Sequence, residues 1–390
     1  MPVNFQHIQG QIREMGAQLP QRLEKLEQRR LEARRLFEDY AADLDGLGQR
    51  LAQALQTNQN LRCAIPALER LDFAHTPVDA PLPRVILAAD GSQVNPDRHA
   101  AVEFGVINIG VFRMVLADDA VPSERVESRL LGDQELYTDQ GMIGEEVVAL
   151  MRDYEERAAL LRLAKDEAAP VVTLTDGPLE LFREPRSQQR YQEYFQKYLG
   201  TLQDMASHRI LCAGYVDRPR ADLLVRLLEL AHPLYKPEIN GARPLRGISD
   251  ALLFQDVLQP GQRSAVFGIQ SRSAASFTGE IALHFFYLNL GRPDMPAMAR
   301  VEIPAWLAAD AAQLDLLHAV IASQSAQLGA RPYPYVLHRA HEIAVVTYDE
   351  HRQLESMIQY EMMRNGIPLQ TSSHKQFHKD HSGDRTRYQS

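Results

Sequence analysis

Cysteine is scarce in this chain of 390 residues, since Cys63 and Cys212 are its two cysteines. Two cysteines do not make the disulfide framework of a secreted domain, and they fit a reducing compartment. No apolar run reaches the roughly 18 residues that a bilayer span needs, and the N-terminus lacks a charged-then-apolar signal pattern. We therefore expect a cytoplasmic protein with no membrane partner, and we interpret Cys212 as a packed core residue.

Several motifs of well-known enzyme classes are also missing. The chain has no Gly-Lys-Ser or Gly-Lys-Thr phosphate loop, no Rossmann glycine fingerprint and no His-Glu-x-x-His sequence. It has no Gly-x-Ser-x-Gly elbow for a serine nucleophile and no paired-cysteine knuckle for zinc. These absences leave carboxylates and histidines as the groups from which a site would be built.

Positive charge is in the minority, because the formal net charge is −9. This balance argues against a protein that coats nucleic acid by bulk electrostatics, although it leaves room for local basic clusters. The candidates are Arg29-Arg30, Arg34-Arg35 and Arg218-Pro219-Arg220, and we interpret the first two as solvated helix faces. With 45% hydrophobic residues the chain can bury a sizeable core.

The most informative sequences present are two apolar runs that each lead into Asp-Gly. Residues 85–89 precede Asp90-Gly91, and residues 171–175 precede Asp176-Gly177. Each run predicts a buried strand that ends in an acidic residue and a turn. Ligands bind at such strand ends in open α/β sheets, and two close carboxylates attract a divalent cation. The alternative is a pair of ordinary strand-ending turns.

The remaining pattern predicts an α/β fold with a helical N-terminal extension. An apolar stripe over residues 5–57 predicts helix, with a break at Pro20, and either packs on its own domain or serves dimerisation. Helices at about 141–167 and 187–207 alternate with strands at 171–175 and 210–216, which favours a mixed sheet covered on both faces. We predict three domain segments: a helical arm at 1–75, a main domain at 76–368 with additional strands inserted at 264–305, and a polar tail at 369–390.

Further site candidates come from the helices. On a helical wheel Glu155 lies beside the apolar stripe of its helix and Glu156 nearly opposite, so Glu155 is expected at the sheet edge and Glu156 in water. His338 and His341 are three residues apart and share a helix face. Either histidine could ligate a metal or act as acid or base, and a surface or capping role is the alternative for each.

The ordered set of short motifs resembles the NurA family of DNA-repair nucleases, in its bacterial form, over about residues 83–345. The resemblance rests on Asp90-Gly91-Ser92-Gln93, Thr175-Asp176-Gly177-Pro178-Leu179, Gly214-Tyr215-Val216-Asp217-Arg218-Pro219, Pro260-Gly261-Gln262-Arg263-Ser264, Arg300-Val301-Glu302-Ile303-Pro304 and Tyr333-Pro334-Tyr335-Val336-Leu337-His338-Arg339-Ala340-His341.

This resemblance implies an RNase H-like core and a 5′-to-3′ DNA exonuclease that also cuts single strands internally. It implies Mn²⁺ or Mg²⁺ as cofactor, two ions in all, and a homodimer that works on DNA ends with a hexameric ATPase of the HerA type. By position it implies that Asp90, Asp176, His341 and a helical glutamate, Glu155 or Glu156, are the metal ligands. The wheel selects Glu155.

The same resemblance gives a role to two more residues. Tyr215 matches the family tyrosine and would stack on a base or bond a phosphate, and Arg218 would neutralise a backbone phosphate. A core-filling aromatic is the alternative for Tyr215. The alternatives to a DNA exonuclease are a catalytically weak relative that acts as a DNA clamp or structural partner of the ATPase, and an RNase H-like hydrolase of RNA or nucleotides.

Overall fold

The computed structural model describes residues 4–77, 82–97, 102–116, 121–139, 141–182, 189–236, 238, 241–329 and 331–366. The chain forms two compact units. Unit 1 comprises Met1–Leu82, Gly177–Leu181 and Ala213–Pro334, and unit 2 comprises Pro83–Asp176, Phe182–Cys212 and Tyr335–Ser390. The predicted polar tail at 369–390 lies outside the described residues.

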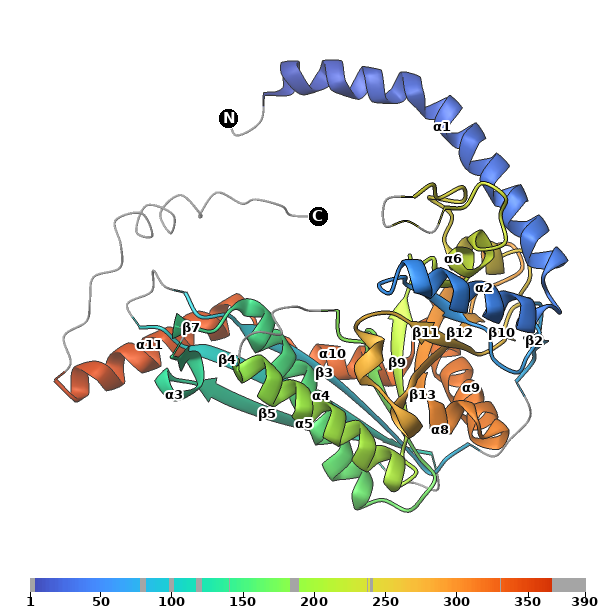
Figure 1. The fold of residues 1–390 in the computed structure, drawn as a ribbon. Coiled ribbons are helices and arrows are strands. Elements are labelled where there is room, and N and C mark those ends of the chain that lie inside the picture. Colours follow the sequence, from blue (N-terminus) through green and yellow to red (C-terminus); the bar gives the residue numbers. More distant parts are fainter. Residues whose placement is uncertain are drawn as a thin grey trace. The chain divides into compact units, whose positions relative to one another are not determined.

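Unit 2 is built on an antiparallel meander followed by a parallel strand (Figure 1). Strands β3 (Val85–Val94), β4 (Gly105–Val115) and β5 (Ser123–Leu131) pair in sequence, and β8 (Val171–Asp176) pairs with β3 in parallel. The resulting order β5-β4-β3-β8 is that of an RNase H-like core. It confirms the predicted mixed α/β fold.

Helices cover this sheet. Helix α4 (Glu145–Lys165) provides the connection between β5 and β8 and packs on β3 and β4, while α5 (Gln189–Ser207) packs on α4. Helix α10 (Tyr335–Ala344) also packs on β3 and β4. The smaller elements of unit 2 are α3 (Asp133–Leu136), β6 (Tyr137–Thr138), β7 (Gly141–Met142) and α11 (Tyr348–Arg364).

Strand β3 does not end at Asp90, and the predicted turn at Asp90-Gly91 is wrong. The strand continues to Val94, with Asp90 paired to Gly110 and Gly91 paired to Ile109 on β4. It is β8 that stops, at Asp176. The glycine after Asp90 therefore has a packing role, described below, rather than a turn role.

Unit 1 carries the other strands and the N-terminal helices. Its main sheet has the order β1-β11-β12-β13-β9, and β10 pairs with both β12 and β2. The strands are β1 (Cys63–Ile65), β2 (Ala74–His75), β9 (Leu211–Asp217, in unit 1 from Ala213), β10 (Arg263–Ser264), β11 (Phe267–Gln270), β12 (Leu283–Asn289) and β13 (Met298–Pro304). The additional strands predicted within 264–305 are thus present as part of a sheet.

The helices of unit 1 are α1 (Phe5–Asp39), α2 (Leu44–Thr57), α6 (Leu223–Glu229), α7 (Asp250–Phe254), α8 (Ala305–Ala308) and α9 (Ala311–Ala326), with 3₁₀ turns η1 (Ala274–Ser276) and η2 (Gly279–Ile281). A buried aromatic cluster, Phe254, Phe267, Phe285 and Tyr287, forms part of the core. Within the described residues, no helix combines the length and the apolar character that crossing a bilayer would need.

The predicted helix break at Pro20 is wrong. Helix α1 runs through Pro20, and the break falls between Asp39 and Leu44. The residues around Pro20 are exposed, so the carbonyl that loses its amide donor can bond to water. The next helix begins where the Asp43 side chain caps it by accepting from the Gly46 amide.

Candidate active site

Asp90 and Asp176 lie at the same level on neighbouring strands. The parallel register of β3 and β8 runs from Val85 opposite Val171 to Ala89 opposite Thr175, so the two aspartates are the next residues on each strand. Asp176 is exposed, and the Asp90 side chain is 18% exposed. Because paired strands lie about 4.8 Å apart, two carboxylates leave the sheet close to each other.

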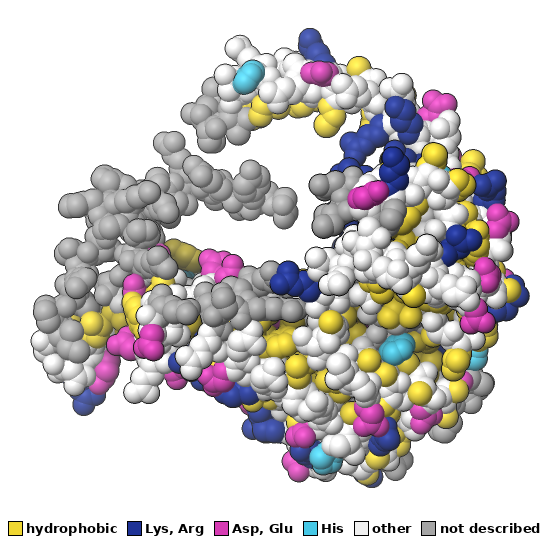
Figure 2. All heavy atoms as spheres, viewed as in Figure 1, with side chains coloured by type: hydrophobic (Ala, Val, Ile, Leu, Met, Phe, Trp, Pro, Cys, Tyr) yellow, Lys and Arg dark blue, Asp and Glu magenta, His cyan; other side chains and the backbone are white. Residues whose placement is uncertain are grey.

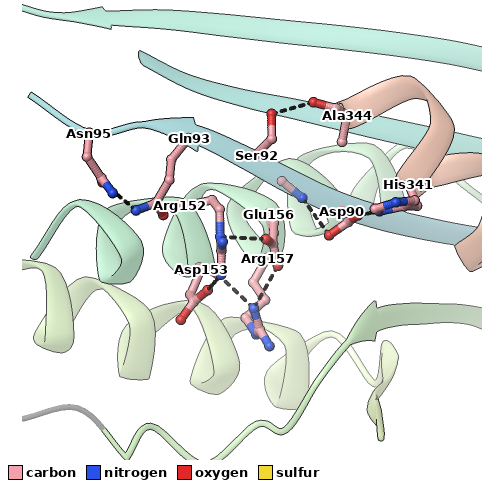
Figure 3. A network of polar contacts seen from close by, with 11 residues as sticks. Asp90, Ser92, Gln93, Asn95, Arg152, Asp153, Glu156, Arg157, His341 and Ala344 are labelled. Atoms are coloured by element: carbon pink, nitrogen blue, oxygen red, sulfur yellow. Dashed lines mark hydrogen bonds and ion pairs between the residues drawn. The ribbon is translucent and has the colours of Figure 1, made fainter. Parts of the chain in front are cut away.

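His341 reaches Asp90 from α10 (Figure 3). Its Nδ1 lies 2.6 Å from Asp90 Oδ2, while Asp90 Oδ1 accepts a hydrogen bond of 2.9 Å from the Gly91 amide. His338 does not take part: its Nε2 lies 3.6 Å from Glu342 Oε1. The structure thus separates two histidines that the sequence placed on one helix face.

A glycine explains how α10 comes so near. Gly110 is the partner of Asp90 on β4, and a Cβ there would lie 2.6 Å from the Ala344 amide nitrogen and 2.8 Å from the Ala340 carbonyl oxygen. The end of α10 is then fixed to the sheet, because Ala344 O accepts hydrogen bonds from Ser92 Oγ and Asn108 Nδ2.

A second glycine admits α4 from the other face of the sheet. Side chains alternate along a strand, so Gly91 faces opposite to Asp90. A Cβ on Gly91 would lie 2.7 Å from Arg152 Cγ and 2.8 Å from Glu156 Oε1. The Glu156 carboxylate therefore rests against the strand one residue after Asp90.

Glu156 is a buried acid held by arginines, and it is 3% exposed. Its oxygens lie 3.4 Å from Arg152 Nε and 3.2 Å from Arg157 Nη1 (Figure 3). Burial raises the pKa of Glu156 from 4.5 to about 8, Arg157 and Arg152 oppose the rise, and the negative charges of Asp153 and Asp90 add to it. Glu156 is thus within electrostatic reach of Asp90.

The expectation that Glu156 faces water is wrong, and Glu155 takes a different direction. Glu155 Oε1 accepts from Arg129 Nη1 at 2.9 Å, and that arginine also contacts Tyr194 on α5. The wheel failed because α4 is buried on two faces, against the sheet and against α5, so one apolar stripe does not define its inside.

Tyr215 and Arg218 belong to unit 1. The Tyr215 ring is 1% exposed and packs edge to face on Tyr333, with ring centroids 5.4 Å apart. This burial favours the core-filling alternative, since a buried ring does not present a face for base stacking. Arg218 has an 84% exposed side chain and a positive φ of 44°, with Nε 3.6 Å from Asp217 Oδ2.

The donor types of Asp90, Asp176, Glu156 and His341 fit Mg²⁺ or Mn²⁺, which take carboxylate oxygens and, for Mn²⁺, an imidazole. Among the described residues, however, no three His, Cys, Asp or Glu side chains gather closely enough to hold an ion. Asp90 bonds His341, and Glu156 bonds arginines. In this structure protein contacts therefore occupy the side chains of Asp90, His341 and Glu156.

Sequence reasoning missed Arg152 and Arg157, both of which hold Glu156. Their signal was a cluster of charges, Arg152-Asp153 and Glu155-Glu156-Arg157, inside an otherwise apolar helix. Such a cluster resembles a solvated face, yet Arg157 is 3% exposed and stacks over the Tyr198 ring at 5.1 Å.

Comparison with solved structures finds similar proteins at low identity. The NurA nuclease from Sulfolobus solfataricus has a TM-score of 0.46 and 11% identity, over 84% of this chain and 95% of that one. The catalytic domain of human endonuclease V has a TM-score of 0.35 and 13% identity, over 83% and 99%. LC9-RNase H1 has a TM-score of 0.23 and 14% identity, over 37% and 67%.

No curated protein is similar enough in sequence to count as a match. The model of the NurA domain family, by contrast, matches residues 84–346, which is more than half of the chain. That range contains β3, β8, α4 and α10, the elements that carry Asp90, Asp176, Glu156 and His341. The chain therefore belongs to the NurA family.

Proposed function

We propose that this NurA-family chain is a metal-dependent nuclease that hydrolyses the phosphodiester bonds of DNA. The observation that carries the proposal is the contact of Asp90 with His341 from α10, with Asp176 at the next register position of the paired strand. Glu156 from α4 lies against Gly91, the residue after Asp90. Gly110 and Gly91 let α10 and α4 approach β3 and β4 from opposite faces of the sheet.

Asp90, Asp176, Glu156 and His341 would hold the cation, most simply Mn²⁺ or a pair of Mn²⁺ or Mg²⁺ ions. When bound, such ions make water nucleophilic at neutral pH and compensate charge on the leaving oxygen. The protein's own contribution is orientation: the Gly91 amide fixes one Asp90 oxygen, His341 contacts the other, and Arg152 and Arg157 hold the Glu156 carboxylate. We propose Glu156 as the helical ligand in preference to Glu155, because Glu156 lies against Gly91, the residue after Asp90, whereas Glu155 points to Arg129.

The finer description rests on the family resemblance. It comprises a 5′-to-3′ exonuclease with single-strand endonuclease activity in DNA end resection, a homodimer, and a hexameric ATPase of the HerA type as partner. Arg218 is exposed and available to a backbone phosphate. We keep the proposed division into a helical arm at 1–75 and a nuclease domain at 76–368, for which the family match at 84–346 is the support.

The test is cleavage of end-labelled DNA by the full chain with Mn²⁺ or with EDTA. Asp90→Asn is expected to lower the Mn²⁺-dependent rate by at least about 100-fold, because it removes the carboxylate that contacts His341 and neighbours Asp176. The control is Asp166→Asn, the same chemical change at the exposed far end of α4, which should leave the rate unchanged.

Near wild-type turnover in Asp90→Asn would overturn the metal-site proposal. Faster Mn²⁺-dependent cleavage of RNA than of DNA would favour the RNA hydrolase. Wild-type protein that binds DNA but shows no cleavage with either metal would favour the clamp that serves the ATPase.

A further inference from the structure

A groove in unit 1 runs between α1 and the segment Arg246–Gly247, with a volume of about 670 Å³. Its lining is basic and polar and contains no acidic residue: Gln18, Gln21, Arg22, Lys25, Leu26, Arg29, Arg246 and Gly247. None of these residues belongs to the candidate active site.

Local geometry holds the two sides of this groove together. Gly247 has a φ of 99°, a conformation that favours glycine, and a Cβ there would lie 3.0 Å from Leu26 Cδ2. Arg29 Nη1 donates to the Arg246 carbonyl oxygen at 2.6 Å. The groove is therefore a defined contact between helix and loop rather than a gap beside a helix.

The charges of α1 are sorted between its faces. Arg22, Lys25 and Arg29 follow at intervals of three and four residues, so they share the groove face. On the adjacent face, Arg30 and Arg34 are neutralised by Asp256, at 2.7 and 3.9 Å. Figure 2 shows Lys and Arg side chains gathered beside α1.

The groove cations are not compensated in the same way. Across the described parts of the chain, none of Arg22, Lys25, Arg29 and Arg246 forms an ion pair with an acidic side chain. These four cations line one groove, although the chain as a whole has a net charge of −9. An anionic ligand would supply the missing countercharge.

We propose that this groove binds the sugar-phosphate backbone of DNA. Lys, Arg and Gln are common phosphate-contacting side chains, and the lining holds no aromatic ring for base stacking, so contact with the backbone fits better than reading of bases. From Arg22 to Arg29 the helix rises about 10 Å, which matches roughly three phosphates along one strand.

The proposal rests on the proposed function in one respect, the choice of DNA as the polyanion. Binding is therefore measured without cleavage, by fluorescence anisotropy of labelled single-stranded and duplex 20-mers with the full chain in EDTA, at salt concentrations from 50 to 200 mM. The groove variant is Arg22→Gln with Lys25→Gln and Arg246→Gln. Arg29 is kept because its guanidinium holds the loop.

The matched control is Arg13→Gln with Arg34→Gln and Arg35→Gln, which removes the same charge from other faces of α1. Loss of three phosphate contacts is expected to weaken duplex binding at least about tenfold and to make the salt dependence shallower by about 2.7 logarithmic units per decade. The control should change neither value by more than a small fraction of this.

Wild-type affinity in the groove variant would overturn the proposal, and so would an equal loss in the control, which would show bulk charge alone. Unchanged DNA binding with lost binding of a poly-glutamate peptide would assign the groove to an acidic protein partner instead. Failure of the nuclease proposal looks different, because DNA binding would persist in wild type while Mn²⁺-dependent cleavage was absent.

Discussion

At the scale of single residues, the close approach of α4 to β3 beside Asp90 depends on Gly91, which has no side chain. Gly91 leaves the space in which Arg152 and Glu156 lie against β3. Any larger residue would push α4 away from the strand or turn the carboxylate aside. The position of Glu156 beside β3 therefore depends on a residue of another element, which helical periodicity alone does not reveal.

The first residue-scale prediction separates the two neighbouring glutamates. Glu156→Gln is expected to lower Mn²⁺-dependent cleavage by at least about 100-fold, since an amide cannot ionise to give the carboxylate that a divalent cation would bind, while Glu155→Gln should cost less than about tenfold. End-labelled DNA assays on both variants measure this. Loss confined to Glu155→Gln would restore the choice made by the helical wheel.

The two glutamate variants can also be compared without metal, by measuring how the melting temperature Tm depends on pH. Glu156 has its pKa raised from 4.5 to about 8 in the folded chain, so the folded state binds the extra proton between these values. Unfolding then releases a proton, and stability falls as pH rises through this window. In EDTA the fall in Tm between about pH 4.5 and 8 should be smaller in Glu156→Gln than in wild type or Glu155→Gln.

A second residue-scale prediction concerns the two histidines of α10. His341→Ala should weaken Mn²⁺ binding and lower cleavage by about 10-fold or more, because it removes the imidazole that contacts Asp90. His338→Ala should change both by less than about twofold, since its ring contacts Glu342. Calorimetry of Mn²⁺ binding decides the matter, and unchanged affinity in His341→Ala would leave a site of carboxylates alone.

The sequence predicted these residues unevenly. Asp90, Asp176 and His341 were proposed as site residues because each lies in a short motif, and the structure brings Asp90 and His341 into contact. The environment of Glu156 was missed because its burial depends on α5 and on Gly91, both distant in sequence. Tyr215 was identified by its motif, but its burial comes from packing on Tyr333.

At the scale of elements, the periodicity of apolar residues predicted the long helices and the buried strands well. It predicted the edge strand β5 and the ends of some elements poorly. Helices α4 and α5 fall close to their predicted ranges of 141–167 and 187–207. Strand β5 was not predicted, because its residues are mostly charged and exposed, and its pairing with β4 alone makes it a strand. Pro20 predicted a helix break and Asp90-Gly91 predicted a turn, and both predictions were wrong. Helix α1 continues through Pro20, and strand β3 continues through Gly91.

One element-scale prediction follows from the approach of α10 to the sheet. Gly110→Ala places a methyl group about 2.6 Å from backbone of α10, so the helix must shift. We expect a loss of about 1–3 kcal/mol in unfolding free energy and a weaker Mn²⁺ affinity, because His341 moves with the helix. Gly132→Ala, at a position with nothing within 4 Å, is the control. Denaturant unfolding that showed equal stability for both variants would contradict this account.

At the scale of the whole molecule, the first turns of α1 leave an apolar stripe uncovered. Ile8, Ile12, Met15, Leu19 and Leu23 are between 38% and 65% exposed, whereas Ala33, Leu36 and Phe37 further along the helix are buried. Of the two roles that the sequence left open for this stripe, packing on its own domain applies to the later residues. The earlier ones remain available for association.

We predict a homodimer in solution, with this part of α1 contributing to it. Multi-angle light scattering at micromolar concentration should give twice the mass of 44.0 kDa. Ile12→Ser with Leu19→Ser should raise the dimer dissociation constant by at least about tenfold, because it replaces exposed apolar surface by hydroxyls. The control is Gln9→Ser with Gln28→Ser, two exposed polar positions of the same helix. A wild-type monomer would contradict the prediction.

The exposed edge strand β5 is a surface on which strands of two copies of the chain could pair. It ends the strand order of unit 2 among the described strands, and its charged side chains include Glu124, Arg125, Glu127 and Arg129. All four take part in ion pairs: Glu124 with Arg339, Glu127 with Arg125 and Arg162, and Arg129 with Glu155. A second chain that added its own strand here would therefore have to remove water from many charges. At high protein concentration this edge strand therefore resists pairing with the same strand of another copy, which would otherwise lead to extended β-aggregates.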